Sequence, residues 1–220
     1  MYKNCNLFFH CHFFVVTLHP QTVKTMYPST SNKYFQLTAG QIDKVGNAMI
    51  YLSEKMPGIS KTKMLKLLYL LDEFSIRKSG IPFFNLQYKV WKLGPVAEEI
   101  FVELSDKPFR FGKYVEIKNT ENGIAIYPKS NFCDDEFSDN DIDLLEEFSN
   151  RFLMITGNQL VEYTHRPNTP WRSTAEENGV YGLLDRGLIN NTELVIDMSR
   201  LVSNDKHKKN IYQLYMEECF

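Results

Sequence analysis

The sequence of 220 residues lacks several features that would identify a common class of protein. No apolar run approaches the roughly 20 residues that a membrane-spanning helix needs, so no membrane partner is expected. Lys plus Arg (25) nearly balance Asp plus Glu (27), which argues against a strongly basic protein that binds nucleic acid. The four cysteines lack C-x-x-C spacing, so neither a zinc site nor a disulfide framework is predicted. These absences favour a soluble protein of the reducing cytoplasm.

Motifs of catalysis are missing as well. The chain has no Gly-rich phosphate loop, no G-x-S-x-G elbow and no H-E-x-x-H. Only His165 and His207 lie in the part that we expect to fold, so histidine-based acid–base catalysis has few candidates. Eight carboxylates between Asp134 and Glu147 lack the pattern of a calcium loop, and most charge runs are solvated helix faces. The prediction is no enzyme, no metal and no cofactor, with a metal-dependent hydrolase as a remaining alternative.

Residues 1–25 differ from the rest of the chain, since they hold no acidic residue and three of the five histidines. Their apolar run is typical of a secretory signal, but two histidines interrupt it and no small-x-small cleavage site comes before Pro20. A metal site is another alternative, although a second ordered pair of ligands is lacking. Its ligands would be Cys5, His10, Cys11 and His12. We expect an unstructured extension or a start codon assigned too early, with Met26 as the true start.

Hydrophobic periodicity predicts helices in the first half of a domain that spans residues 26–180. Apolar residues three and four apart predict an amphipathic helix over residues 40–55. Ser60 is expected to cap a second helix that ends at Gly80. Between residues 64 and 71 only Lys66 is not apolar or aromatic, which is typical of a buried central helix. A third helix is expected to start at Pro95, with an inward face formed by Val96, Ile100 and Leu104.

The pattern changes in the second half of the domain. Residues 114–127 alternate around Asn122-Gly123, a strong signal for a β-hairpin. Ser138 is the expected cap of an amphipathic helix with an acidic start. A short helix is expected from Asn158, and a last ordered piece from Trp171.

Residues 181–220 are predicted to be a C-terminal extension packed on the domain. Leu194, Val195 and Ile196 suggest a short strand, and the residues from Ile211 suggest a helix. The predicted fold class is mainly α, a compact helical bundle with a small β-hairpin insertion.

Two segments, 66–104 and 160–171, carry the most specific pattern in the chain. The first contains a K-L-L-Y helix, a G-x-P linker and an aromatic residue followed by G-P-V, and the second reads L-x-x-x-T-H…P-W. The matching residues are Lys66, Leu67, Leu68, Tyr69, Gly80, Pro82, Trp91, Gly94, Pro95, Val96, Leu160, Thr164, His165, Pro170 and Trp171. Together the segments resemble the Panacea domain, the SocA-like antitoxin family of bacteria and their phages, over roughly residues 42–175.

The resemblance implies an antitoxin that neutralises a cognate toxin, encoded nearby, by direct protein–protein binding. One branch of the family hands its toxin to a cellular protease, which makes a protease a second candidate partner. The alternative is a phage- or plasmid-associated DNA-binding regulator, because many antitoxins repress their own promoters. The acidic overall charge and the apolar second helix count against nucleic acid as a partner, since a recognition helix needs exposed polar residues.

The resemblance also selects candidate site residues, which are either structural or toxin-binding. They are Lys66, Tyr69, Trp91, Gly94, Pro95, Val96, His165 and Trp171. Lys66 is expected to reach the surface or to meet a carboxylate, because an unpaired buried ammonium is costly. Trp91 and Trp171 are either core residues, which we favour, or interface anchors. His165 is expected to form hydrogen bonds within the fold.

The acidic segment is the candidate partner-facing surface. Its representative residues are Asp139, Asp141 and Asp143. Many toxins act on nucleic acids through basic sites, and an acidic helix would steer and complement such a partner.

Overall fold

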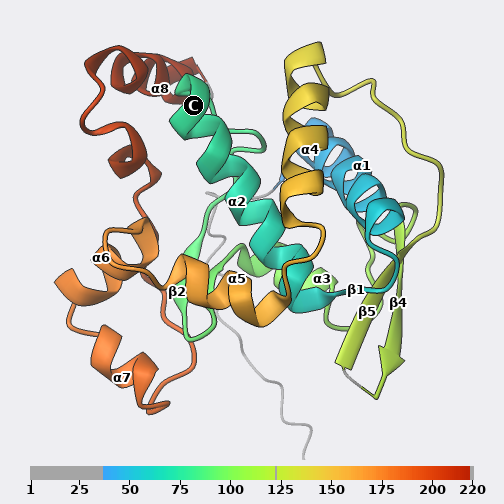
Figure 1. Cartoon of the computed structure of the whole chain (residues 1–220), viewed down its shortest axis with the longest axis horizontal. Coiled ribbons are helices and arrows are strands. Elements are labelled where there is room, and N and C mark those ends of the chain that lie inside the picture. The colour runs from blue at the N-terminus through green and yellow to red at the C-terminus, as the bar shows by residue number, and fades with distance from the viewer. Residues whose placement is uncertain (1–36, 122, 219–220) are drawn as a thin grey trace, which may run out of the picture. The chain divides into compact units, whose positions relative to one another are not determined.

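A computed structural model describes residues 37–121 and 123–218, which belong to the unit Phe35–Phe220. The predicted extension at residues 1–25, with its candidate metal ligands, lies outside the described residues. The described part is about 52% helical, with eight α-helices and a small amount of antiparallel sheet (Figure 1). This confirms the prediction of a mainly α fold with a minor β component. A compact helical bundle is not confirmed, because short helices and two small sheets surround one central helix.

Helix α2 (Lys61–Ser79) is that central helix. It begins after Ser60, whose Oγ accepts a hydrogen bond from the Lys63 N–H at 3.3 Å. It ends at Gly80, which has the left-handed conformation (φ 83°) that favours glycine at a helix C-terminus. All residues from 64 to 73 are buried, and the all-round apolar pattern predicts this for residues 64–71.

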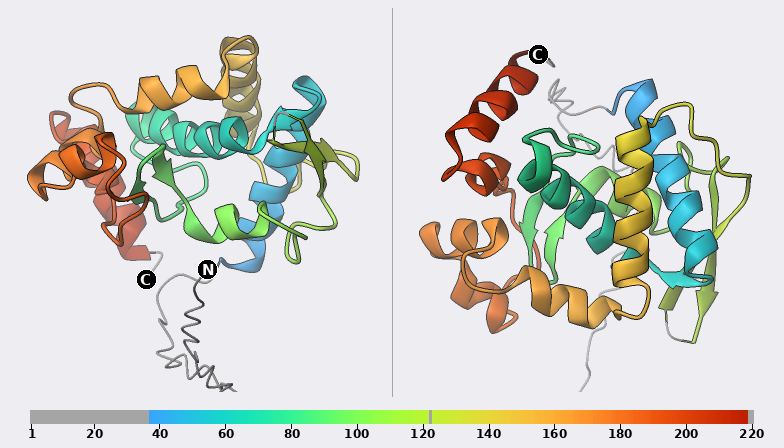
Figure 2. Two further views of the ribbon diagram at one scale, coloured as in Figure 1. Left: turned by 90° about the horizontal axis from the view of Figure 1, so that it is seen from below. Right: turned by 45° about the horizontal axis from the view of Figure 1, so that its top comes forward.

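The other long helices pack around α2. Helix α1 (Ala39–Lys55), helix α4 (Asp139–Phe152), helix α5 (Gly157–Thr164) and helix α8 (Lys206–Glu218) all contact it. In Figure 2, α4 and α5 cover one side of α2, and a short hairpin lies on the other. The predicted cap at Ser138 is confirmed as a capping box with Asp141, and α1 begins with a similar box at Thr38.

Two antiparallel sheets flank the helices. Strands β4 (Val115–Thr120) and β5 (Gly123–Pro128) form the predicted hairpin, and β1 (Ile59–Ser60) pairs with the outer side of β5. Strands β2 (Lys89–Trp91) and β3 (Gly94–Val96) form the second sheet. Trp91 lies opposite Gly94, so Lys92 and Leu93 make a two-residue turn.

The prediction that Pro95 begins the third helix is wrong. Pro95 lies in β3 opposite Val90, and helix α3 (Glu98–Glu103) begins only after Ala97. A fixed proline φ suits an extended strand as well as a first helical turn, and here the pairing with β2 decides between them. The inward face was predicted correctly, because Val96, Ile100 and Leu104 are buried.

The C-terminal part continues with helix α6 (Pro170–Glu177), helix α7 (Tyr181–Asp185) and the 3₁₀ helix η1 (Met198–Val202). The strand expected at residues 194–196 is reduced to one isolated pairing of Val195 with Lys89. The Val90 N–H donates to the Leu194 carbonyl at 2.9 Å, so this segment runs along the outer edge of β2. None of the helices within residues 37–218 has the length and apolarity that crossing a membrane requires.

Candidate functional site

The candidate site lies where the β2–β3 hairpin meets α2, the end of α5 and the start of α6. Lys66 comes from α2, Gly94 and Pro95 from β3, His165 from the C-cap of α5 and Trp171 from α6. These residues are far apart in the sequence, and the fold joins them through hydrogen bonds and ring contacts. The motif residues therefore form one cluster, whereas the acidic residues lie elsewhere on α4.

Lys66 is the most unusual member of the cluster. It is only 1% exposed, and its Nζ donates to the Pro95 carbonyl oxygen at 2.8 Å. Burial lowers the pKa of Lys66 from its ordinary value of 10.5 to about 7, and no carboxylate among the described residues contributes to that shift. The expectation that Lys66 reaches the surface or meets a carboxylate is therefore wrong. A backbone carbonyl satisfies the amine instead, and loss of its charge reduces the cost of burial.

Gly94 allows the hairpin to approach Lys66 this closely. Its φ of 97° lies in the region that favours glycine. A Cβ at this position would lie 2.6 Å from Thr164 Oγ1 and 3.1 Å from Lys66 Cε. Both the backbone conformation and the lack of space therefore require glycine at the start of β3.

Trp171 and His165 support the same hairpin from α5 and α6. Trp171 is buried, and its Nε1–H donates to the Trp91 carbonyl at 3.0 Å. The His165 ring lies edge-on to the Trp171 ring, with 3.9 Å between their centroids. The pKa of His165 is lowered, mainly by burial and then by the charge of Lys66, while backbone hydrogen bonds at Val161 and Lys92 act in the opposite direction. Trp171 is thus a core residue, and His165 is held within the fold.

Trp91 and Tyr69 differ in their exposure. Trp91 is half-buried and packs edge-on against Phe101, with 4.8 Å between ring centroids. Tyr69 is fully buried and packs edge-on against Tyr88 at 5.0 Å, and burial together with the nearby Glu73 raises its pKa. The Trp91 indole nitrogen and the Tyr69 hydroxyl are buried without a hydrogen-bond partner among the described residues.

Asp72 is a buried ionisable residue that the sequence analysis missed. Its carboxylate accepts hydrogen bonds from the N–H groups of residues 84, 85 and 86 at 2.6, 3.2 and 3.2 Å, and from the Tyr88 hydroxyl at 2.7 Å. Burial raises the pKa of Asp72, and these four bonds oppose that shift. Asp72 thereby fixes the linker between α2 and β2. An acidic residue directly after an apolar helical run was the only signal of this role.

The three carboxylates of the acidic surface differ in their exposure and contacts. Asp139 and Asp143 are exposed, but Asp141 is half-buried. The Asp141 carboxylate completes the capping box with Ser138 and lies 3.0 Å from the Lys44 amine of α1. Asp141 is therefore part of the fold, while Asp139 and Asp143 are exposed on α4.

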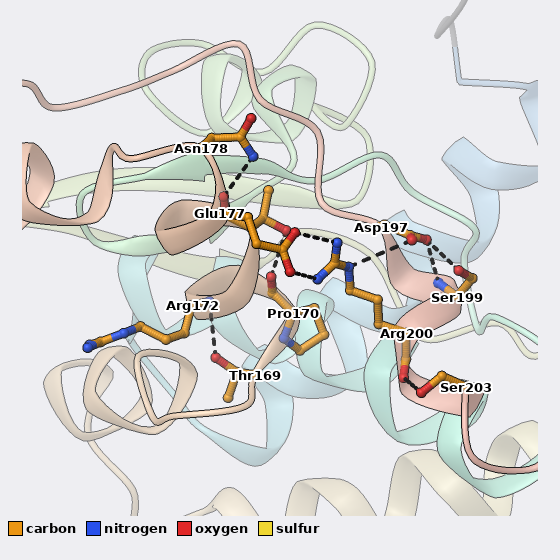
Figure 3. A network of polar contacts seen from close by, with 10 residues as sticks. Thr169, Pro170, Arg172, Glu177, Asn178, Asp197, Ser199, Arg200 and Ser203 are labelled. Atoms are coloured by element: carbon orange, nitrogen blue, oxygen red, sulfur yellow. Dashed lines mark hydrogen bonds and ion pairs between the residues drawn. The ribbon is translucent and has the colours of Figure 1, made fainter.

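An ion-pair network ties the C-terminal segment to α6 (Figure 3). The Arg200 guanidinium in η1 donates two hydrogen bonds, each 2.6 Å long, to the two carboxylate oxygens of Glu177. Asp197 lies 3.7 Å from the same guanidinium and also caps η1 through the Ser199 N–H. This fork geometry fixes η1 beside the helix that carries Trp171.

Residues 64–172, about half of the chain, match the family model described as antitoxin SocA-like, Panacea domain. The matched range contains all eight motif residues of the cluster. No curated protein and no solved structure matches the chain. In the part of the chain that the structure describes, no group of three or more His, Cys, Asp or Glu residues could hold a metal ion.

Proposed function

We propose that this chain, which belongs to the SocA-like Panacea antitoxin family through residues 64–172, neutralises a cognate toxin by binding it directly. The family match is the observation that carries the proposal. The order and spacing of the motif residues support it, because the fold uses them together in one cluster. The toxin is expected to be encoded beside this chain.

The chain is proposed to act by covering the toxin's surface and without turning over a substrate. The two motif side chains with acid–base chemistry near neutral pH are Lys66 and His165. Lys66 is buried on the Pro95 carbonyl, and His165 packs on Trp171 and bonds to backbone groups. Both side chains are thus engaged by groups of the fold itself, which supports a binding role.

Co-expression with the neighbouring open reading frame tests the proposal. The neighbour alone should arrest growth, growth should return when this chain is also expressed, and the two proteins should co-purify. A neighbour that is harmless alone, or rescue without a complex, would contradict direct neutralisation. The half-life of the toxin distinguishes simple occlusion from delivery to a protease, because only delivery shortens it.

A DNA-binding regulator remains the second candidate. It is supported by exposed basic residues at the start of α8 (Lys206, His207 and Lys209). The helix that resembled a recognition helix in sequence, α2, is unsuitable, because its residues 64–73 are buried in the core. A lack of binding to the chain's own upstream DNA at low salt, where phosphate contacts are strongest, would dismiss this candidate.

A further inference from the structure

We propose that an extended segment of the proposed toxin pairs with the outer edge of β2, an inference that rests on the function proposed above. Residues 187–195, which we call the strap, cover this edge. The strap lies outside the matched range 64–172, whereas β2 lies inside it. The strap thus occupies the edge in the free protein, and a strand of the toxin takes its place in the complex.

The outer edge of β2 consists of backbone groups that point away from β3. The Val90 N–H donates to the Leu194 carbonyl at 2.9 Å, and the Val90 carbonyl accepts from the Thr192 hydroxyl at 2.7 Å. The Lys92 N–H, just past the end of the strand, donates to the Asn190 carbonyl at 2.8 Å. A row of N–H and C=O groups at the edge of a sheet is the template on which a further strand pairs.

The opposite edge of the sheet, along β3, offers no such template. Pro95 has no N–H, and its carbonyl already accepts a hydrogen bond from Lys66 Nζ. Helices α2 and α5 also pack against β3. A strand can therefore join this sheet only along β2, and the buried motif residues determine which of the two edges is available.

The strap itself contributes little to the core. None of its residues is fully buried, and Ile189 and Leu194 are the two that pack against the core. The residues on either side are held firmly, since Leu184 is only 1% exposed and Ile196 only 3%. The strap can therefore leave β2 between two fixed points, and no fully buried side chain leaves the core with it.

The side chains of the strap indicate what kind of segment can replace it. The Glu193 carboxylate lies 2.6 Å from Lys89 Nζ, and Leu194 beside it packs against the core. Lys89 also pairs with Glu98 of α3, which stays in place when the strap leaves. In strand addition the backbone bonds provide affinity, and alternate side chains provide specificity. The toxin segment is therefore expected to be extended and to carry a carboxylate next to an apolar residue, in place of Glu193 and Leu194.

A disulfide between β2 and the strap can test whether the strap must move. Val195 lies opposite Lys89 in an isolated antiparallel pairing, and the backbone hydrogen bonds lie on either side of this pair. The Cα atoms of such a pair are typically about 4.5 Å apart. A disulfide needs a Cα separation of about 4.4–6.8 Å, so two cysteines at these positions can be joined without moving the backbone.

The locked variant is Lys89→Cys/Val195→Cys in the full chain, with the four native cysteines replaced by serine. When it is oxidised, it should bind the product of the neighbouring open reading frame at least about 100-fold more weakly than when it is reduced. The reduced chain is the matched control, because it carries the same substitutions. Thermal unfolding checks that both forms are folded.

A second variant weakens the strap and does not depend on the disulfide. Thr192→Ala removes the hydrogen bond to the Val90 carbonyl, so the strap leaves the edge more often. The toxin should then bind about fivefold more tightly, because a larger fraction of the chain is ready to bind. Ser203→Ala is the control, since the Ser203 hydroxyl donates to the Arg200 carbonyl outside the strap and its loss should leave binding unchanged.

Equal binding by the oxidised and the reduced chain would overturn the inference, because the toxin would then bind without displacing the strap. Unchanged binding by Thr192→Ala, or an equal gain in Ser203→Ala, would also overturn it. These results would leave the proposed function intact, since the unmodified chain would still bind and neutralise its neighbour. A neighbour that the unmodified chain neither binds nor neutralises would contradict the proposed function itself.

Discussion

At the scale of single residues, Lys66 shows how the fold accommodates an amine that no carboxylate compensates. Its only described hydrogen-bond acceptor is the Pro95 carbonyl, and burial brings its pKa to about 7. In the unfolded chain the same amine has its ordinary pKa of 10.5. Between these two values the unfolded state binds more protons than the folded state, so the free energy of unfolding must rise with pH.

The first prediction follows from this rise of the free energy of unfolding with pH. Between pH 8 and pH 10, the free energy of unfolding of the unmodified chain should rise relative to that of Lys66→Met, by up to about 1.4 kcal/mol per pH unit. His165 is neutral throughout this range, because its pKa is lowered, so it does not contribute. Urea unfolding of both chains at each pH measures the difference. Parallel pH profiles would show that Lys66 is not buried as an amine with a lowered pKa.

The second prediction concerns Trp171, which fills the core and holds the hairpin. Trp171→Ala should lower the free energy of unfolding by about 3–5 kcal/mol, because a large buried ring is lost. Trp171→Phe should cost less, since it removes the hydrogen bond to Trp91 but keeps most of the volume. Urea unfolding gives both values. A Trp171→Ala chain that unfolds normally but no longer binds the proposed toxin would instead make Trp171 an interface anchor.

The sequence alone predicts the burial and hydrogen-bond partners of some residues but not of others. The burial of Tyr69 follows from its place in an apolar run. The environments of Lys66 and Asp72 do not, because their partners are backbone groups of the hairpin and of the linker. Such partners are set by the path of the chain and leave no pattern of side chains in the sequence.

At the scale of elements, long periodic segments were predictable and short paired ones were not. α1, α2 and α4 carry both an apolar face and recognisable capping residues, so local physics determines them. β2 and β3 have three residues each, too few for a periodicity, and they form because distant segments pair with them and pack on them. The mistaken helix start at Pro95 came from that missing non-local information.

The third prediction compares two glycines with positive φ. Gly94 and Gly123 have φ values of 97° and 102°, but only Gly94 is crowded, by Thr164 and Lys66. Gly123→Ala should cost about 1–2 kcal/mol through backbone strain alone. Gly94→Ala should cost clearly more, because Thr164 or the hairpin must also move. Thermal unfolding measures the stability of the two variants. Equal losses of stability would contradict the close packing of β3 on α5.

The fourth prediction separates the carboxylates at the start of α4. Asp141→Asn should lower the free energy of unfolding by about 1 kcal/mol, because it weakens the capping box and the contact with Lys44. Asp143→Asn is the matched control and should change stability by less than about 0.5 kcal/mol, since Asp143 is exposed. Urea unfolding at one pH measures both. A larger effect at Asp143 would show that the surface carboxylates are structural too.

At the scale of the whole described unit, segments beyond the family match complete the core. Ile196, Met198 and Val202 are buried, and Arg200 ties η1 to α6 through Glu177 (Figure 3). α8 differs, because none of its residues is fully buried. The sequence predicted a helix from Ile211 in an extension packed on the domain, but it did not indicate which elements the helix contacts, and these are α2 and η1. The matched range therefore forms most of the core, and the C-terminal segment beside β2 supplies the remaining buried side chains.

The final prediction tests how α8 joins that framework. A Cβ on Gly80 would lie 2.6 Å from the Lys208 carbonyl oxygen, so the first turn of α8 lies directly against the end of α2. In the full chain, Gly80→Ala lowers stability for two reasons, namely the backbone strain at a φ of 83° and this clash. In a chain that stops after Asp205, the clash disappears and only the strain remains.

Gly80→Ala should therefore destabilise the full chain by about 1–3 kcal/mol more than it destabilises the shortened one. The measurement is a double-mutant cycle. Thermal unfolding of the four chains is followed by circular dichroism at 222 nm, which reports helix content. The shortened chain without the substitution is the control, and it should still unfold cooperatively because α8 contributes no fully buried residue. Equal effects of Gly80→Ala in both backgrounds would mean that α8 does not rest on α2, and that the end of α2 is closed by the left-handed glycine alone.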